Sequence, residues 1–224
     1  MSRWRLVVGL SLLVLVADQW TKMLAVLHLT PGIAAAHLAD KGERLIDRAH
    51  QRDVVRELSL FESLRRFYFE VEAPCESRGS MCPEVRVIDG FWSWRYAENR
   101  GAAFSLFAKM GKGLRLPFLL TVTTFGLGFL LSYVRKLRDD QQALVVALSL
   151  ILGGGLGNLI DRTHFGYVVD FTLWYYGTFR WPIFNVADTA IVTGACLIGL
   201  VSVLELVQAR RKGHAGVAEP RTEG

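Results

Sequence analysis

Apolar positions along this chain are concentrated in four long runs, at roughly residues 6–29, 116–134, 143–160 and 186–207. Each run is about as long as the ~20 helical residues that cross a ~30 Å hydrocarbon core. A single run of this kind would also suit a buried core helix. Four of them in a chain of 224 residues instead predict four transmembrane helices.

The segment after the first run has a different pattern. Residues 31–66 are of mixed charge, and their apolar side chains recur near helical spacing. This pattern predicts one or two amphipathic helices. They would lie on the membrane surface or form an ordinary solvated insertion, and the sequence leaves both alternatives open.

The pattern changes again from Phe67. Phe67 and Phe69 alternate with Tyr68 and Glu70, residues 85–87 alternate as well, and the stretch FWSWRYAEN at 91–99 is rich in aromatics. Alternation of this kind predicts short strands, here around a turn at CESRGSMC, residues 75–82. The two cysteines of that turn would form a short disulfide or remain reduced thiols.

The distribution of Lys and Arg along the chain predicts which side of the membrane each terminus occupies. The net charge is +5, and basic residues gather at Arg3 and Arg5, at 135–138 and at 210–212, beside the apolar runs rather than in a nucleic-acid-binding patch. With four spans, all three clusters fall on one side. The positive-inside rule makes that side the cytoplasm, so both termini are expected there.

The N-terminus also has features of a secretory signal peptide, because two arginines precede an apolar stretch. Cleavage after Ala17 would require a small residue where the chain has Leu15, and the apolar pattern continues past Asp18. We therefore expect the first run to be retained as a span.

Two carboxylates stand out because each ends a run of apolar or small residues: Asp170 in YVVD and Asp188 in NVAD. An acid in such surroundings is costly to ionise unless it is paired or hydrogen-bonded. Two such acids brought together can share one proton, which is how an aspartic protease activates water.

Other polar residues in or beside the spans are best interpreted as structural. Asp18 and Lys22 are four residues apart, so they share a helix face and can pair near the membrane surface. Asp161 is a further candidate acid, but Arg162 follows it, and a salt bridge between them is the simpler interpretation. The histidines and cysteines show no zinc-ligand spacing, so we expect neither a metal nor another cofactor.

Four stretches together resemble the lipoprotein signal peptidases, also called signal peptidase II. They occur in the family's order on the predicted spans: ADQWTK (17–22), NRGAAFS (99–105), GNLIDR with GYVVDF (157–171), and FNVADTA (184–190). The resemblance does not extend to residues 31–84. That segment is expected to be an extracytoplasmic insertion in a single membrane domain covering residues 1–224, whose tail, 213–224, is expected to be disordered.

The resemblance implies an all-α membrane protein with four transmembrane helices, a small extracytoplasmic β-rich cradle and a helical insertion. It implies a monomeric aspartyl endopeptidase of the bacterial inner membrane, whose site lies near the extracytoplasmic face. Its partners would be membrane lipid and a prolipoprotein bearing a diacylglyceryl Cys, cut on the N-terminal side of that residue, with no nucleic acid involved.

The resemblance also assigns roles to individual residues. Asp170 and Asp188 would be the catalytic pair. The supporting and substrate-binding residues would be Asn99, Gly101, Asn158, Asp161, Arg162, Asn185, Asp18 and Lys22.

Two other function classes fit parts of the sequence. A four-span transporter would use ionisable groups in the spans, but these groups gather near one face and make a poor pathway across the bilayer. A non-enzymatic scaffold would use the insertion to bind a partner. A transporter would show ion flux without peptide cleavage, and a scaffold would tolerate loss of either Asp170 or Asp188.

Overall fold

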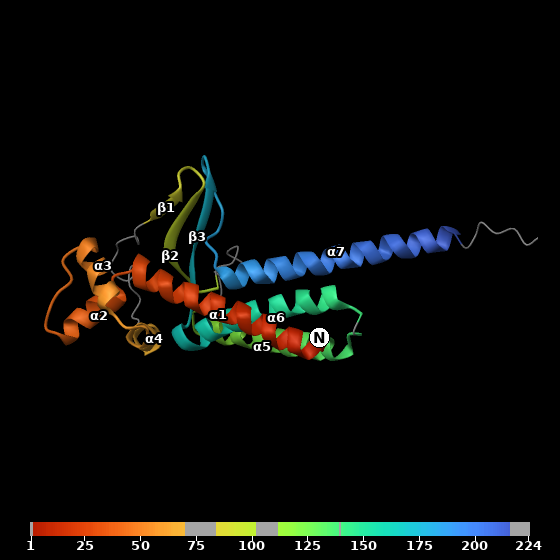
Figure 1. The fold of residues 1–224 in the computed structure, drawn as a ribbon, viewed down its shortest axis with the longest axis horizontal. Coiled ribbons are helices and arrows are strands. Elements are labelled where there is room, and N and C mark those ends of the chain that lie inside the picture. Colours follow the sequence, from red (N-terminus) through yellow and green to blue (C-terminus); the bar gives the residue numbers. More distant parts are fainter. Residues whose placement is uncertain (1, 70–83, 102–111, 139, 216–224) are drawn as a thin grey trace, which may run out of the picture.

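Four long helices form the body of the protein (Figure 1). The structure is a computed structural model that describes residues 2–69, 84–101, 112–138 and 140–215. The helices are α1 (Arg3–Leu29), α5 (Lys112–Lys136), α6 (Gln142–Phe165) and α7 (Val186–Ala215). All four are long and apolar enough to cross a membrane. The prediction of four spans is confirmed, and the chain is a multi-pass membrane protein.

Helix α6 is the centre of the bundle because its glycines allow two neighbours to approach closely. A Cβ at Gly153 would lie 2.7 Å from the carbonyl oxygen of Ser11 on α1, and one at Gly154 would collide with the carbonyl oxygen of Ala187 on α7. Small residues at helix interfaces serve this purpose in membranes. About half of the most apolar stretch of α1 and of α6 is buried in the protein, whereas few residues of the corresponding stretches of α5 and α7 are fully buried.

A small antiparallel sheet stands across one end of the spans (Figure 1). Its strands, in spatial order, are β1 (Val85–Ile88), β2 (Trp92–Asn99), β3 (Val168–Tyr176) and β4 (Phe179–Arg180). In the pairing of β2 with β3, Ala97 lies opposite Asp170, and Asn99 lies opposite Val168. The end of β2 is therefore fixed beside the acid carried by β3.

Three short helices follow α1 at the same end of the molecule: α2 (Gly32–Asp40), α3 (Arg48–Glu57) and α4 (Leu60–Phe69). The side-chain amide of Gln51 donates to the carbonyl oxygens of Leu27 (3.1 Å) and Thr30 (2.5 Å). It thereby satisfies acceptors that the end of α1 leaves open. The segment is helical, as predicted, but it forms three helices rather than one or two.

The predicted strand beginning at Phe67 is wrong, because residues 67–69 form the last turn of α4. Phe67 is fully buried and Phe69 is exposed. Two positions along a helix correspond to a rotation of roughly 200°, so the two rings point to opposite sides. Strands β1 and β2 instead meet at a turn through Gly90, whose φ is 77°. The cysteines at 75 and 82, and the tail from residue 216, lie outside the described residues. Residues 213–215, which were expected to belong to a disordered tail, form the end of α7.

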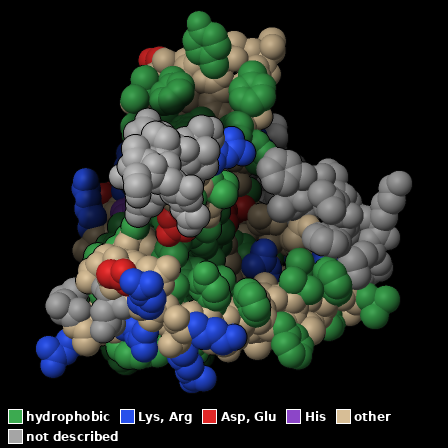
Figure 2. Space-filling model, turned by 90° about the vertical axis from the view of Figure 1, so that its right-hand side faces the viewer, with side chains coloured by type: hydrophobic (Ala, Val, Ile, Leu, Met, Phe, Trp, Pro, Cys, Tyr) green, Lys and Arg blue, Asp and Glu red, His purple; other side chains and the backbone are tan. Residues whose placement is uncertain are grey.

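The three basic clusters lie at the end of the bundle opposite the sheet. The N-terminus of α1, the connection between α5 and α6 and the far end of α7 all point the same way (Figure 1). The Arg3 guanidinium donates to the carbonyl oxygen of Leu137, which joins the first two of these segments. Viewed from this side, Lys and Arg side chains gather over the lower part of the molecule, whereas the tip of the sheet at the top is hydrophobic (Figure 2).

Candidate active site

Asp170 is held inside the protein by its strand. It is 2% exposed, and the preceding residues of β3, Val168 and Val169, are buried with it. Its carboxylate accepts a hydrogen bond from the Asn185 side-chain amide at 2.7 Å. The Asn99 side chain, at the end of β2, forms another hydrogen bond with it. The strand pairing thus brings Asn99 to an acid that lies 71 residues further along the chain, at position 170.

Asp188 is held by the first turn of α7. Its backbone N–H donates to the side-chain oxygen of Asn185 at 2.9 Å, and the Asn185 N–H donates back to the Asp188 carboxylate at 3.4 Å. This reciprocal arrangement is a capping box, with Asn185 at the N-cap and Asp188 three residues later. The helix N-terminus also stabilises negative charge at this position. Asn158 of α6 donates a further hydrogen bond to Asp188 at 2.8 Å.

Asn185 links the two acids, because it binds Asp170 through its side chain and Asp188 through its backbone. The same amide group lies 3.2 Å from the side-chain oxygen of Asn158 and 3.3 Å from the carbonyl oxygen of Val169. One residue therefore joins α6, β3 and α7 at the point where the acids meet. Asp170 and Asp188 are brought together, as the sequence predicted.

The environment of Asp170 favours its protonated form. Burial raises the pKa of this carboxyl well above its ordinary value, and the nearby charge of Asp188 raises it further. Hydrogen bonds from Asn99 and Asn185 and the positive charge of Lys22 act in the opposite direction but do not outweigh burial. Asp188, by contrast, is partly exposed at the edge of a cavity. The two acids thus occupy different surroundings, which is how a pair divides acid and base roles.

A buried ionic triad lies beneath the acids. The Lys22 ammonium is 2.7 Å from Asp18 and 2.9 Å from Asp161, and all three side chains are fully buried. The predicted pair of Asp18 and Lys22 is present, but it is buried in the bundle. The ion pair expected between Asp161 and Arg162 is wrong, because Asp161 turns inward to Lys22, while Arg162 lines the cavity.

Each carboxylate of the triad also holds the backbone next to a candidate catalytic acid. Asp161 accepts from the N–H of Val169 at 3.0 Å, and Asp18 accepts from the N–H of Ala187 at 2.9 Å. These N–H groups belong to the residues immediately before Asp170 and Asp188. Lys22 in turn donates to Asn158 at 3.0 Å. One buried ammonium therefore fixes the positions of both acids through two carboxylates and an amide.

Sequence reasoning missed two members of this network, Gln19 and Tyr68. The Gln19 amide donates to Asp161 at 2.9 Å, and its oxygen accepts from the Tyr68 hydroxyl at 2.8 Å. Gln19 was detectable as a polar residue beside Asp18 within an apolar run. Nothing in the local pattern signals Tyr68, because its contact depends on how the insertion folds back onto α1.

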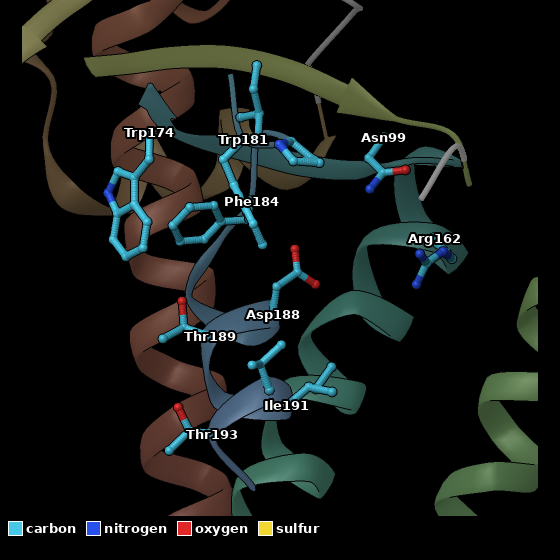
Figure 3. Close-up of a pocket in the computed structure, with 12 residues that line it drawn as sticks. Asn99, Arg162, Trp174, Trp181, Phe184, Asp188, Thr189, Ile191 and Thr193 are labelled. Atoms are coloured by element: carbon cyan, nitrogen blue, oxygen red, sulfur yellow. The ribbon is translucent and has the colours of Figure 1, made fainter. Parts of the chain in front are cut away.

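A cavity of about 430 Å³ opens beside Asp188 (Figure 3). Figure 3 shows the Asp188 carboxylate pointing into it, with Asn99 and Arg162 on one side and aromatic side chains on the other. The apolar part of the lining comes from Trp174, Trp181, Pro182, Ile183, Phe184, Ile191 and Val192. The cavity therefore combines a carboxylate and a guanidinium with a large hydrophobic wall.

Gly101 lies beside this site but faces α5. Its φ is 97°, and a Cβ built there would lie 2.5 Å from the Leu119 side chain. Its N–H donates to the side-chain oxygen of Asn99 at 3.0 Å, which orients that amide. Within the described part of the chain, no three His, Cys, Asp or Glu side chains are grouped so that they would hold a metal ion.

Comparison with known proteins agrees with this architecture. A family model described as "Signal peptidase (SPase) II" matches residues 64–204. A protein of Geobacter sulfurreducens named "Lipoprotein signal peptidase" is 48% identical over 121 residues, covering 54% of this chain and 74% of that protein. A protein of the same name from Anaeromyxobacter sp. (strain Fw109-5) is 35% identical over 205 residues, covering 89% and 85%.

The fold also matches a solved bacterial membrane enzyme with a TM-score of 0.55. That structure is 22% identical in sequence, and the match covers 89% of this chain and 87% of the other. It supports the arrangement of spans and sheet described above. With the family model covering more than half of its length, the chain belongs to the signal peptidase II family.

Proposed function

We propose that this protein is an aspartyl endopeptidase that removes signal peptides from diacylglyceryl-modified prolipoproteins, cutting on the N-terminal side of the lipidated Cys. The related proteins that are named lipoprotein signal peptidases support the substrate class. The observation that carries the mechanism is the arrangement of the two acids. A buried Asp170 and a cavity-facing Asp188 are joined by Asn185.

In the proposed reaction, Asp188 acts as the base and Asp170 as the acid. Ionised Asp188 takes a proton from a water molecule, whose oxygen attacks the scissile carbonyl carbon, while the Asp170 proton passes to the carbonyl oxygen. The resulting gem-diol collapses as one of its hydroxyl groups returns a proton to Asp170, the C–N bond breaks, and Asp188 gives its proton to the leaving nitrogen. One acid holds the remaining proton, so the pair again carries a single shared proton and is ready for another cycle.

The surrounding residues have supporting roles in this proposal. Asn185 and Asn158 hold the acids at the reacting centre, and Asn99 at the end of β2 lies where it can orient the substrate backbone. Arg162 stabilises the loop or meets the lipid phosphate. The aromatic wall of the cavity suits the hydrophobic residues and the lipid of a prolipoprotein, since ligand sites are largely apolar with a few polar groups.

The proposal also places the protein in the bacterial inner membrane, with the site near its extracytoplasmic face. The acids lie at the end of the bundle that carries the sheet, and the basic clusters lie at the other end. By the positive-inside rule the basic end faces the cytoplasm. A substrate anchored in the outer leaflet would then have its cleavage site level with Asp188.

A gel-shift assay in detergent tests the proposal. Purified protein is mixed with a diacylglyceryl-modified prolipoprotein and, in parallel, with the unmodified precursor. We expect cleavage of the lipidated form only. Asp170→Asn and Asp188→Asn should each lower the rate by at least about 100-fold, the lower end of what a positioned acid or base contributes. Both variants should retain the helical circular dichroism of the wild type.

Asp140→Asn serves as the matched control, because this acid is exposed and pairs with Arg138 at the opposite end of the bundle. It should cleave at the wild-type rate. Full activity in Asp170→Asn would refute the assignment of this acid. Absence of cleavage by a well-folded wild type would refute the proposed activity.

A further inference from the structure

Helix α4 has an apolar face directed away from the protein. Leu60 and Leu64 are 54% and 36% exposed, and Phe61 and Phe69 are 76% and 79% exposed. Leu60, Phe61 and Leu64 are three and four residues apart, so they are neighbours on the helix surface. At about 100° per residue, Phe69 falls at the edge of the same half of the helix, which also carries Arg65 and Tyr68. A surface-exposed cluster of this kind is unusual in water and marks an interaction site.

The buried side of α4, which adjoins the exposed residues, fixes how the helix is rotated. Phe67 is fully buried, with its ring 5.3 Å from that of Phe165 on α6. Arg66 is also buried and binds Asp40 at the end of α2, at 2.8 Å. Since these contacts hold the inner side in place, the side chains of the outer face cannot turn inward to bury themselves.

The orientation of α4 is that of a helix lying in the membrane plane. Figure 1 shows α4 nearly end-on, whereas the spans run across the picture, so its axis crosses theirs at a steep angle. A helix perpendicular to the spans runs parallel to the membrane surface.

The contacts of α4 also fix its depth along the membrane normal. Its rings contact His164 and Phe165, the last two residues of span α6. The Tyr68 hydroxyl reaches Gln19, which belongs to span α1 and lies ten residues before its end. The helix is therefore level with the last turn of α6, where that span leaves the hydrocarbon core.

We propose that α4 is a membrane-interface helix whose outer face is covered by phospholipid acyl chains. Leu60, Phe61, Leu64 and Phe69 insert into the extracytoplasmic leaflet beside α1 and α6. Amphipathic helices bind at this depth through a buried apolar face, and aromatic side chains favour the boundary between hydrocarbon and headgroups. Of the two interpretations that the sequence left open for this segment, the geometry selects the membrane surface, and this holds whichever reaction the protein catalyses.

Spin-label accessibility in vesicles tests this inference. Single cysteines replace Phe61, Leu64 or Phe69 in a protein whose three native cysteines are Ser, and each carries a nitroxide. The protein is reconstituted into phosphatidylethanolamine and phosphatidylglycerol vesicles. Relaxation by oxygen, which concentrates in lipid, is compared with relaxation by a water-soluble nickel chelate. Phe125, exposed on span α5, gives the lipid reference, and Glu62 on the polar side of α4 gives the matched control.

At the three apolar positions we expect oxygen to increase the relaxation rate of the nitroxide several-fold more than the nickel chelate does, as at the Phe125 site. At the Glu62 site we expect the nickel chelate to have the larger effect. Ready access of the nickel chelate to the labels at 61 and 64 would mean a solvated insertion and would overturn the proposal. Poor access of both reagents would mean that another protein segment or a second copy covers the face, and would also overturn it.

A second measurement uses the unmodified wild type, so it does not depend on whether the variants fold. Vesicles contain a phospholipid with a photoreactive diazirine in its acyl chain, and labelled peptides are identified by mass spectrometry. Labelling should appear in residues 57–65 and be absent from residues 45–56, which cover most of α3. Absence of label from 57–65, while span α5 is labelled, would contradict the inference.

Discussion

The two acids at the site differ in burial because they belong to different elements of secondary structure. Asp170 belongs to a strand whose neighbours bury it, whereas Asp188 caps the first turn of a helix and faces a cavity. The positions of both acids depend on the buried triad of Asp18, Lys22 and Asp161. Asp161 and Asp18 each hold the N–H group just before one of the acids, and Lys22 neutralises part of their charge. Removing a single buried charge would leave its partners unpaired, which makes the residues of this triad sensitive to substitution.

Asp170→Asn should make the protein inactive but more stable at neutral pH. Because burial raises the folded-state pKa of this carboxyl, the folded protein keeps its proton as pH rises above about 4, the ordinary Asp value, while the unfolded chain loses it. Stability is therefore lost as pH rises towards the folded-state pKa. Each unit of elevation corresponds to about 1.4 kcal/mol, or about 3–6 °C in the midpoint of thermal unfolding for a chain of this size.

Thermal melts in detergent between pH 4 and 8 measure this effect. The melting temperature of Asp170→Asn should exceed that of the wild type at pH 7–8, and this difference should shrink towards zero near pH 4. Asp161→Asn provides the contrast. It removes one partner of buried Lys22 and should lower stability by about 3 kcal/mol, as breaking a buried ion pair does. A lower melting temperature for Asp170→Asn at pH 7 would contradict the argument.

At the scale of elements, α6 determines how the site is assembled. Its glycines let α1 and α7 approach on two sides, so that Asp18 lies against Gly157 and Asp188 reaches Asn158 near its end. The position of Gly157 is restricted by the buried triad. A Cβ added there would collide with the Asp18 carboxylate, which is itself bound to Lys22. A shift of Asp18 would be transmitted to Ala187 and hence to Asp188.

Gly157→Ala should therefore lower both stability and cleavage. Overpacking of this kind costs about 1–3 kcal/mol, and displacement of Asp18 should reduce kcat. Gly126→Ala on α5 is the matched control, since a Cβ there meets nothing within 4 Å. Melting temperature and cleavage rate are measured for both variants. If both variants had the same melting temperature and cleavage rate, α1 would have room to move away from the methyl group added at position 157, and the prediction would be wrong.

In the whole molecule, the three basic clusters beside the spans and the acids lie at opposite ends of the bundle. The clusters at Arg3 and Arg5, at 135–138 and at 210–212 occupy one end, while the two acids, the sheet and the arginine-rich insertion occupy the other. A membrane places these ends in different compartments. The same geometry brings the cavity to one boundary of the bilayer, beside an interfacial helix on the same side of the membrane.

We expect the basic end to be cytoplasmic. Alkaline phosphatase, which requires an oxidising compartment, should be active when inserted in the exposed connection at residues 41–46. Green fluorescent protein fused after the last residue should fluoresce, because it folds in the cytoplasm. Enzyme and fluorescence assays on whole cells measure both. An inactive phosphatase at residues 41–46 together with a dark C-terminal fusion would reverse the orientation.

Features that depend on composition and short-range spacing could be predicted from the sequence. The four spans follow from the length of the apolar runs, and the pair of Asp18 and Lys22 follows from helical spacing. The two acids at the ends of apolar runs were identified in the same way, because burial of a carboxylate is visible in its neighbours. The insertion was predicted to be helical, but its last turn was taken for a strand, since two aromatic residues at alternate positions fit both.

Contacts between groups that are distant in sequence follow from how the helices pack. Asp161 pairs with Lys22 rather than with its neighbour Arg162, because packing of α6 against α1 buries one side of α6 and leaves Arg162 at the cavity. Tyr68 reaches Gln19 only because α4 folds back across the spans. Contacts of this kind depend on helix rotation and crossing, which no local pattern of residues specifies. The sequence therefore determined the spans and the two acids, and the packing of α1, α6 and α7 determined the network that holds them.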